Sequence, residues 1–311
     1  MAYFPAFQFR KRYYKGIIMS DQNSTILVGI DGGGTGCRVA IADADRNIIG
    51  TAKGGPANPT YTPQQARDNI LAAIDAARLD AGLEQTAINS ARAYVGLAGI
   101  RNDTDAEFIA EILPFAQARV VEDRATTVTG ALAGGDGAVA AIGTGSFVAR
   151  SKGGKTGYLG GWGFRLGDQA SGAWLGRNLL ERVILCAEGI EPHSDLTRET
   201  LARYDDDPHA IYEFGNAATP AEFGKLAPLV VDAANKGDPT ATAMMRDGAD
   251  YIVKALNTLG YRPDEPLCLT GGLGPHYTNF LQASFARQVM MPKGSALDGA
   301  LLLASRMGDA P

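Results

Sequence analysis

The chain has 311 residues, of which 45% are hydrophobic and 20% charged, a composition typical of a soluble globular protein, and the length favours two domains. A net charge of −5 and an isoelectric point near 5.3 argue against a nucleic-acid or anionic-membrane partner, because both require a basic surface. Three distant cysteines, Cys37, Cys186 and Cys268, form no CxxC pair, which fits a reducing cytoplasm and excludes a disulfide framework or metal cluster within one chain. No apolar run approaches a membrane span, and residues 1–23 lack a signal-peptide core, so we interpret them as an extension outside the fold.

The first half of the chain alternates strands and helices in the order β-β-β-α-β-α-β. Short apolar runs predict five strands, at residues 26–31, 37–42, 47–52, 92–97 and 119–122. Thr62 is the expected N-cap of a helix that has Pro63 at its first position and Gln65 in a capping box. Gly82 is expected to end that helix, and a second helix is predicted over 103–113.

The same pattern begins again at Gly137. The stretch "GAVAAIGTGSFVARSKGGKTGYLG" repeats "ILVGIDGGGTGCRVAIADADRNIIG" in outline, as strand, glycine turn, strand, polar turn and strand. Helices at 171–185, 240–259 and 297–306 and a strand at 267–270 are expected to follow. Two copies of one α/β unit around a shared cleft predict ligand binding at the turns beyond the strand ends. The expected domains are residues 24–133 closed by 297–311, and residues 134–296.

Each copy carries a glycine-rich turn with a hydroxyl side chain. Glycine lets consecutive N–H groups converge on an anion, and no Cβ blocks the approach of a phosphate. The two turns contain Gly32, Gly33, Gly34 and Thr35, and Gly143, Thr144, Gly145 and Ser146. A third cluster, "LTGGLGPHY", also follows a predicted strand. The motifs of P-loop enzymes, serine hydrolases and zincins are absent, so the chemistry is expected to come from carboxylates.

Three aspartates follow strands or turns, and each has a structural and a functional interpretation. Asp31 either initiates the first glycine turn or orients a hydrated Mg²⁺ beside phosphates. Asp123 is either the N-cap of the next helix or a general base facing the cleft. Trp162 and Asp168 are either a core tryptophan and another N-cap, or a platform for a sugar ring.

The motifs, taken together, resemble those of the N-acetylglucosamine/glucosamine kinases, within the BadF/BadG/BcrA/BcrD-type ATPase group. They are, in chain order, "GIDGGGTGCR", "ANP", "GLAG", "EDRA", "IGTGS", "GGWGFRLGDQASGAW" and "TGGLG". The resemblance runs from about residue 24 to the C-terminus. It implies a duplicated ribonuclease H-like, actin/hexokinase-like fold, with two domains around a nucleotide cleft. It also implies ATP- and Mg²⁺-dependent phosphorylation of the 6-hydroxyl of N-acetylglucosamine or glucosamine.

The resemblance gives each motif a role. The two glycine turns would bracket the phosphates of ATP, with Thr35 and Thr144 as hydroxyl donors, and Asp31 would orient Mg²⁺. Asp123 would take the proton from the attacking sugar hydroxyl. The residues expected near the adenosine are Gly224, Gly271 and Gly272. The residues expected to hold the sugar, beside Asp123, are Asn58, Pro59, Gly161, Trp162, Gly163 and Asp168.

Two positions depart from the animal relatives, and they leave the hexosamine open. Gln169 stands where those relatives have glutamate, and Phe164 replaces a histidine, whereas Trp162 favours the acetylated sugar. An alternative function is an ATPase that activates a 2-hydroxyacyl-CoA dehydratase or benzoyl-CoA reductase, although no cluster-binding cysteine pair is apparent. A sugar-sensing repressor and a slow structural ATPase are further alternatives, and a homodimer is also open.

Overall fold

The computed structural model describes residues 25–60 and 63–308. The extension expected at residues 1–23 and the N-cap expected at Thr62 therefore lie outside the described residues. Within the part that is described, no helix is both long enough and apolar enough to cross a membrane.

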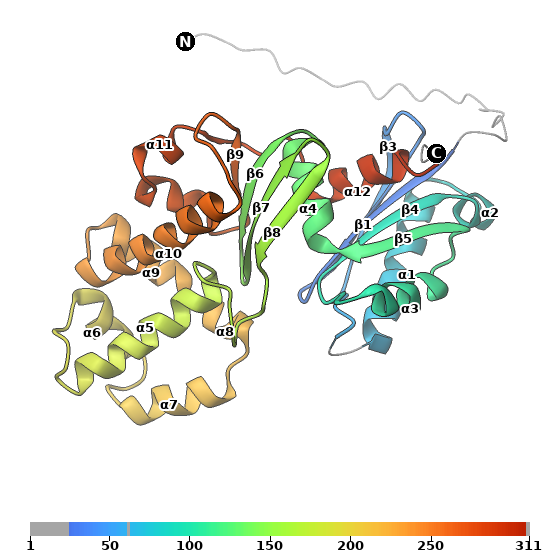
Figure 1. Ribbon diagram of the computed structural model, residues 1–311. Helices are drawn as coiled ribbons and strands as arrows, with labels where there is room; N and C mark the ends of the chain where they lie inside the picture. The colour runs from blue at the N-terminus through green and yellow to red at the C-terminus, as the bar shows by residue number, and fades with distance from the viewer. Residues whose placement is uncertain (1–24, 61–62, 309–311) are drawn as a thin grey trace, which may run out of the picture.

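Two five-stranded sheets form the centre of the molecule (Figure 1), and they have the same topology. The first sheet has the order β3-β2-β1-β4-β5 and the second has the equivalent order β8-β7-β6-β9-β10. In each, the first three strands pair antiparallel and the last two are added in parallel. The strands are β1 (Leu27–Gly32), β2 (Cys37–Ala42), β3 (Ile48–Gly54), β4 (Arg92–Leu97), β5 (Gln117–Glu122), β6 (Gly137–Ile142), β7 (Ser146–Lys152), β8 (Lys155–Gly160), β9 (Leu267–Thr270) and β10 (Val289–Met290). The duplicated α/β fold predicted from the repeat is confirmed.

One face of the first sheet is covered by α1 (Pro63–Asp80) and α3 (Asp103–Ile112), with the short α2 (Gln85–Asn89) beside them. The apolar residues of α1 recur at helical spacing, and Ile70 and Ile74 are buried against the sheet, as predicted. Asn102 caps α3, because its side chain accepts a hydrogen bond from the Asp105 N–H. Sequence periodicity therefore placed α1 and α3 to within one or two residues, whereas α2 was not predicted.

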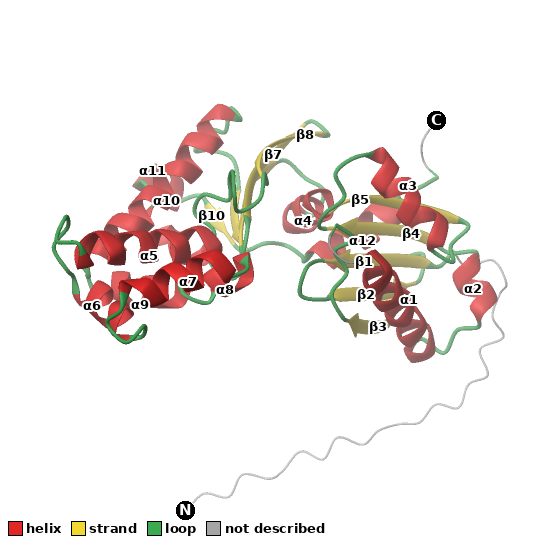
Figure 2. Cartoon of the chain, turned by 90° about the horizontal axis from the view of Figure 1, so that it is seen from below, coloured by secondary structure: helices red, strands yellow, loops and turns green. Residues whose placement is uncertain are grey.

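The second sheet carries a large helical layer on one face (Figure 2). Between β8 and β9 the chain forms α5 (Gly172–Ala187), α6 (Asp195–Ala202), α7 (Pro208–Ala217), α8 (Pro220–Gly224), α9 (Ala227–Asn235) and α10 (Pro239–Thr258). The 3₁₀ helix η1 (Gly274–Phe280) and α11 (Ala283–Ala286) follow β9. The sequence predicted α5 and α10 but none of the four shorter helices between them.

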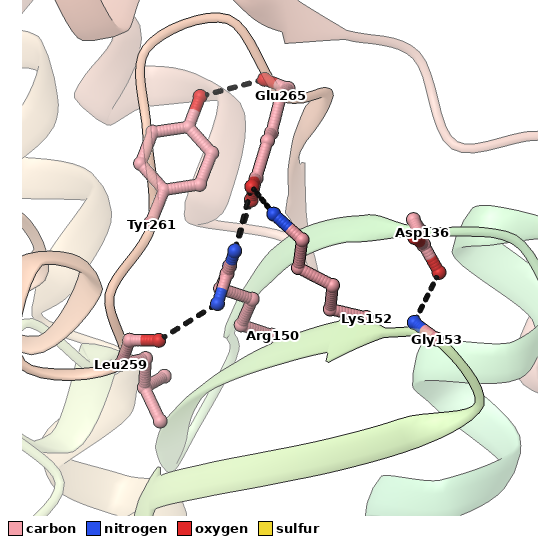
Figure 3. Close-up of polar contacts among 7 residues, drawn as sticks. All are labelled: Asp136, Arg150, Lys152, Gly153, Leu259, Tyr261 and Glu265. Carbon is pink, nitrogen blue, oxygen red and sulfur yellow. Dashed lines mark hydrogen bonds and ion pairs between the residues drawn. The ribbon is translucent and has the colours of Figure 1, made fainter.

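An ion-pair network joins the end of α10 to the second sheet (Figure 3). Both carboxylate oxygens of Glu265 accept hydrogen bonds from Arg150, at 2.6 and 2.7 Å, and Lys152 Nζ is 3.0 Å from the same group. Arg150 also donates to the Leu259 carbonyl, and the Tyr261 hydroxyl donates to the Glu265 carbonyl at 2.8 Å. The hydrogen bonds from Arg150 and Lys152 lower the pKa of Glu265 to about 2. The network therefore fixes the chain between α10 and β9.

The last helix of each half covers the sheet of the other half. α4 (Asp123–Leu132) follows the first sheet but buries Val128 and Leu132 against β6, β7 and β9. α12 (Ala296–Ser305) follows the second sheet but packs Leu301 against β1, β2 and β4. The two helices cross at Gly130 and Gly299, where a Cβ on either glycine would collide with the partner helix backbone. Because α4 contacts both sheets, the expected domain boundaries stay a prediction.

Candidate active site

A cavity of about 1900 Å³ opens between the two halves of the molecule. Single-ligand pockets usually occupy about 300–1000 Å³, so this cleft has room for two ligands side by side. Thirteen of the predicted site residues line it, from both sheets and from the loop before α5: Asp31, Gly34, Thr35, Asn58, Asp123, Gly143, Thr144, Gly145, Gly161, Trp162, Gly163, Asp168 and Gly271. The structure therefore brings together most of the residues singled out from sequence.

A second cavity, of about 440 Å³, adjoins the second glycine turn. Gly143 and Thr144 line both cavities, so the two spaces meet at this turn. The predicted adenosine residues Gly224 and Gly272 line the smaller cavity together with Asp232 and His276. Among the predicted residues, all of which the structure describes, three line neither cavity: Gly32, Gly33 and Pro59.

The glycines of the turns divide into two groups. A Cβ on Gly32 would lie 2.6 Å from Leu97, and Gly271 has φ +79° and packs against the Ile142 carbonyl, so the fold itself explains both. A Cβ on Gly34 or Gly143 would meet nothing within 4 Å, and the same holds for Gly33 and Gly272. No packing constraint explains these four, and the bare backbone of the two that line the cleft, Gly34 and Gly143, leaves room for a phosphate chain.

Asp31 and Asp123 lie at the same edge of the first sheet. β1, β4 and β5 are parallel, and their register aligns Gly32 with Leu97 and Leu97 with Glu122, so residues at these strand ends face one opening. Asp31 forms an ion pair with Arg38 on β2, whose Nε is 3.1 Å from Asp31 Oδ2. Asp31 therefore has a cationic partner that the sequence interpretation did not include.

The carboxylates present fit a weakly held, water-rich magnesium ion. Within the described residues, no group of three His, Cys, Asp or Glu side chains is arranged to hold a metal. Mg²⁺ keeps several waters and is usually bound through one or two carboxylates and the phosphates of its substrate. Asp31 lines the cleft beside the open glycine turn and is one carboxylate of this kind.

Asp123 is the first residue of α4, and the helix N-cap is Glu122, which makes no side-chain cap hydrogen bond. The interpretation of Asp123 as an N-cap is therefore wrong, because its backbone is already helical. Burial, together with the charges of Glu122 and Asp31, raises the pKa of Asp123 to about 6, although Arg124 opposes the rise. A carboxylate with a pKa near 6 is a stronger base than an ordinary aspartate and is still mostly ionised at neutral pH.

The loop between β8 and α5 depends on glycine. Gly160, Gly161 and Gly163 have φ of +82°, +77° and +79°, a region that other residues rarely adopt. This loop holds Trp162 in the cleft with 79% of its surface exposed. The interpretation of Trp162 as a core residue is therefore wrong, and an exposed indole is free to contact a ligand.

Asp168 is buried, with 7% of its surface exposed, and it is not a helix cap. The N-cap of α5 is Ser171, whose hydroxyl accepts a hydrogen bond from the Trp174 N–H at 3.1 Å. Asp168 instead accepts a hydrogen bond from the Ser146 N–H at 3.3 Å, and burial raises its pKa. It thereby connects the loop to the strand that follows the second glycine turn.

Arginine is the residue type that the sequence interpretation missed. Arg38, Arg124, Arg165 and Arg177 all line the cleft. Arg124 forms an ion pair with Glu122, lies 5.1 Å above the Tyr158 ring and donates to the Gly160 carbonyl at 3.4 Å. The signal was present, because Arg38 and Arg124 stand inside the motifs "GIDGGGTGCR" and "EDRA".

Two equivalent sheets, paired glycine turns and an acid at the edge of the cleft between them define an actin/hexokinase-like ATPase fold. Residues 28–304 match the BadF/BadG/BcrA/BcrD ATPase family, and the chain belongs to this family. The expected resemblance is confirmed.

Three relatives are similar over nearly the whole chain. Glucosamine kinase GspK of Vibrio cholerae is 31% identical over 280 residues, which cover 90% of this chain and 95% of that protein. The crystal structure of a candidate N-acetylglucosamine kinase from Chromobacterium violaceum superposes with a TM-score of 0.83 and 34% identity, covering 90% of this chain and 99% of that one. The N-acetylmuramic acid/N-acetylglucosamine kinase of Clostridium acetobutylicum is 23% identical, over 89% of this chain and 97% of that protein.

Proposed function

We propose that this protein is an ATP-dependent kinase that phosphorylates the 6-hydroxyl of an amino sugar, glucosamine or N-acetylglucosamine. The observation that carries the proposal is the position of Asp123, a carboxylate of raised pKa in a two-ligand cleft beside open glycine turns. The similarity to glucosamine and N-acetylglucosamine kinases over nine-tenths of the chain supports the substrate class.

In the proposed complex, the smaller cavity holds the adenosine of ATP, against Gly224 and Gly272. The phosphates run past Thr144 and across the cleft toward Gly34 and Thr35, where main-chain N–H groups and hydroxyls offer donors. Mg²⁺, held through its waters by Asp31, would neutralise phosphate charge. The sugar lies against Trp162, near Asn58 and Asp168.

The proposed reaction needs little from the protein besides alignment and one proton acceptor. The 6-hydroxyl oxygen of the sugar attacks the γ-phosphorus, its bond to the phosphorus forms as the bond to the ADP oxygen breaks, and the Asp123 carboxylate accepts the hydroxyl proton. Arg124 lies directly after the base and pairs with Glu122. This pairing offsets a negative charge that would otherwise repel the incoming phosphates.

A panel of sugars scored by coupled ADP release tests the proposal. Glucosamine or N-acetylglucosamine should stimulate ADP release strongly, with phosphate recovered on the sugar, and glucose should stimulate it less. A rate of ATP hydrolysis that no amino sugar changes would contradict the proposal and would favour an ATPase of another kind.

The alternative, an ATPase that drives a dehydratase or reductase, receives less support. An iron–sulfur cluster at a dimer interface requires accessible thiolates, whereas Cys37, Cys186 and Cys268 are all buried. Burial also raises the pKa of Cys37 and of Cys268, which disfavours the thiolate form. An iron assay on the purified protein distinguishes the two functions.

A further inference from the structure

One buried hydrogen bond connects the helix beside the smaller cavity to the loop proposed to hold the sugar. The Tyr277 hydroxyl donates to the Ala170 carbonyl at 2.8 Å, across 107 positions of sequence. Both residues are fully buried. Burial also raises the pKa of Tyr277, so the hydroxyl remains a hydrogen-bond donor throughout the range in which the protein is folded.

One end of this connection lies against the smaller cavity. Tyr277 belongs to η1, the helix that follows Gly271 and Gly272. Its neighbours Leu273 and His276 line the smaller cavity, and the Leu273 N–H donates to the Ile142 carbonyl just before the second glycine turn. One face of η1 therefore meets whatever fills that cavity, while Tyr277 points into the core.

The other end lies in a strained part of the sugar loop. Asp168 and Ala170 have φ of +59° and +69°, in the left-handed region that residues with a Cβ rarely adopt. Such a conformation persists only where the surrounding structure holds it. Two groups do so here: Ser146, which bonds Asp168 and donates to the Gln169 carbonyl at 2.6 Å, and the Tyr277 hydroxyl.

The packing around Tyr277 leaves it one position. A Cβ on Gly248 of α10 would lie 2.5 Å from the Tyr277 hydroxyl oxygen, so the absence of a side chain there makes room for the phenol. A shift of η1 is therefore passed directly to Ala170, because the ring has no free space in which to absorb it.

We propose that Tyr277 is a positioning residue that couples the two substrates, so that nucleotide in the smaller cavity strengthens binding of the amino sugar at the loop carrying Trp162 and Asp168. The inference rests on the proposed function. Nucleotide contacts with Leu273 and His276 restrict η1, the Tyr277 hydroxyl then holds Ala170 in its left-handed conformation, and Asp168 stays in place for the sugar. The sugar meets a loop that is already ordered, which lowers the entropy cost of binding it.

Tyr277→Phe removes the hydroxyl and keeps the ring, and Tyr261→Phe is the matched control. Tyr261 is also buried and also donates one hydrogen bond of 2.8 Å to a carbonyl, that of Glu265 (Figure 3). It lines neither cavity. Both variants lose one buried hydrogen bond and should lose similar thermal stability. Only Tyr277→Phe should alter how the two substrates affect each other.

The measurement is the affinity for the amino sugar, by calorimetry, with and without saturating MgADP. In the wild type MgADP should tighten sugar binding by a factor of about 5–150, the usual range for coupled sites, and the sugar should tighten MgADP by the same factor. Tyr277→Phe should reduce that factor about two- to twelvefold, the equivalent of one net hydrogen bond, whereas Tyr261→Phe should preserve it. In steady state, the KM for the sugar should rise more than kcat falls.

A Tyr277→Phe protein with the wild-type coupling factor would overturn the inference. A wild type whose sugar affinity is the same with and without MgADP would overturn it too. Neither result would contradict the proposed kinase activity. A wild type that phosphorylates no amino sugar overturns the proposed function and the inference together. If Tyr277→Phe does not fold, Gly248→Ala tests the inference instead. Its added methyl group on α10 would displace the Tyr277 hydroxyl and should also weaken the coupling.

Discussion

Replacing Asp123 by asparagine tests the proposed base without changing the shape of the side chain. A positioned general base contributes about 10²–10⁴-fold to the rate, so kcat of Asp123→Asn should fall by that factor. MgADP affinity should change little, because Asp123 does not line the smaller cavity. Coupled ADP release with a saturating amino sugar measures kcat. A variant with turnover near that of the wild type would remove Asp123 from the mechanism.

The raised pKa of Asp123 predicts the pH dependence of the wild type. The base must be ionised to accept a proton, and its pKa is about 6. As the pH falls below 6, kcat/KM should therefore decrease about tenfold per pH unit, until other groups titrate. The residual activity of Asp123→Asn should lack this acid limb. A wild-type profile that is flat between pH 5 and 7 would contradict the proposed role.

The same pKa predicts that Asp123→Asn is more stable than the wild type. The pKa of Asp123 rises from 3.8 to about 6 on folding, so the folded state binds the proton more tightly and stability falls as pH rises through this window. About two pKa units correspond to at most about 3 kcal/mol of destabilisation above pH 6. The Tm of the variant should exceed that of the wild type at pH 8 and match it at pH 4. An exposed control, Asp250→Asn, should change neither Tm nor kcat, and a gain in Tm independent of pH would refute the burial argument.

Three further changes test the fold and the sugar loop. Glu265→Gln should lower stability at pH 7 by about 1–2 kcal/mol after allowance for solvent screening, and the loss should shrink between pH 4.5 and pH 2, because the lowered pKa of Glu265 stabilises the fold only while the group is ionised. Gly299→Ala should cost about 1–3 kcal/mol by forcing α4 and α12 apart, whereas Gly215→Ala, where a Cβ meets nothing, should not lower the Tm. Trp162→Ala should leave the Tm unchanged, since the side chain is exposed, and raise the KM for the sugar about two- to tenfold; an unchanged KM would remove Trp162 from the sugar site.

The duplicated sheets were predictable because their signals are local. Each half begins with three strands joined by short turns, and turn residues are visible in a single sequence. Of the four missed helices, α6, α8 and α9 have fewer than ten residues, too short for helical periodicity to stand out, whereas α7 is as long as the predicted α3 and α12. Their boundaries still left a signal, since α7, α8 and α9 have proline in the first turn and Thr219 forms a capping box with Glu222.

The candidate site was partly predictable for a different reason. Strand ends in an α/β fold meet at one edge, so Asp31 and Asp123 could be placed together from topology alone. What an individual side chain does there depends on tertiary neighbours. The ion pair of Asp31 with Arg38 and the solvent exposure of Trp162 depend on the tertiary structure. The periodicity of the sequence does not encode them. The contact of Asp168 with Ser146 spans 22 positions and was equally hidden.

The exchange of α4 and α12 has a consequence for how the chain is made. The first sheet is complete in sequence at Glu122, yet the part of its face formed by Leu27, Ala40 and Tyr94 packs against Leu301 and Ala304 of α12, which spans residues 296–305. During synthesis this apolar surface therefore stays exposed to solvent while more than half of the protein is still being translated. We expect that neither half, expressed alone, forms a complete hydrophobic core. The smallest unit able to fold is both sheets together with α12.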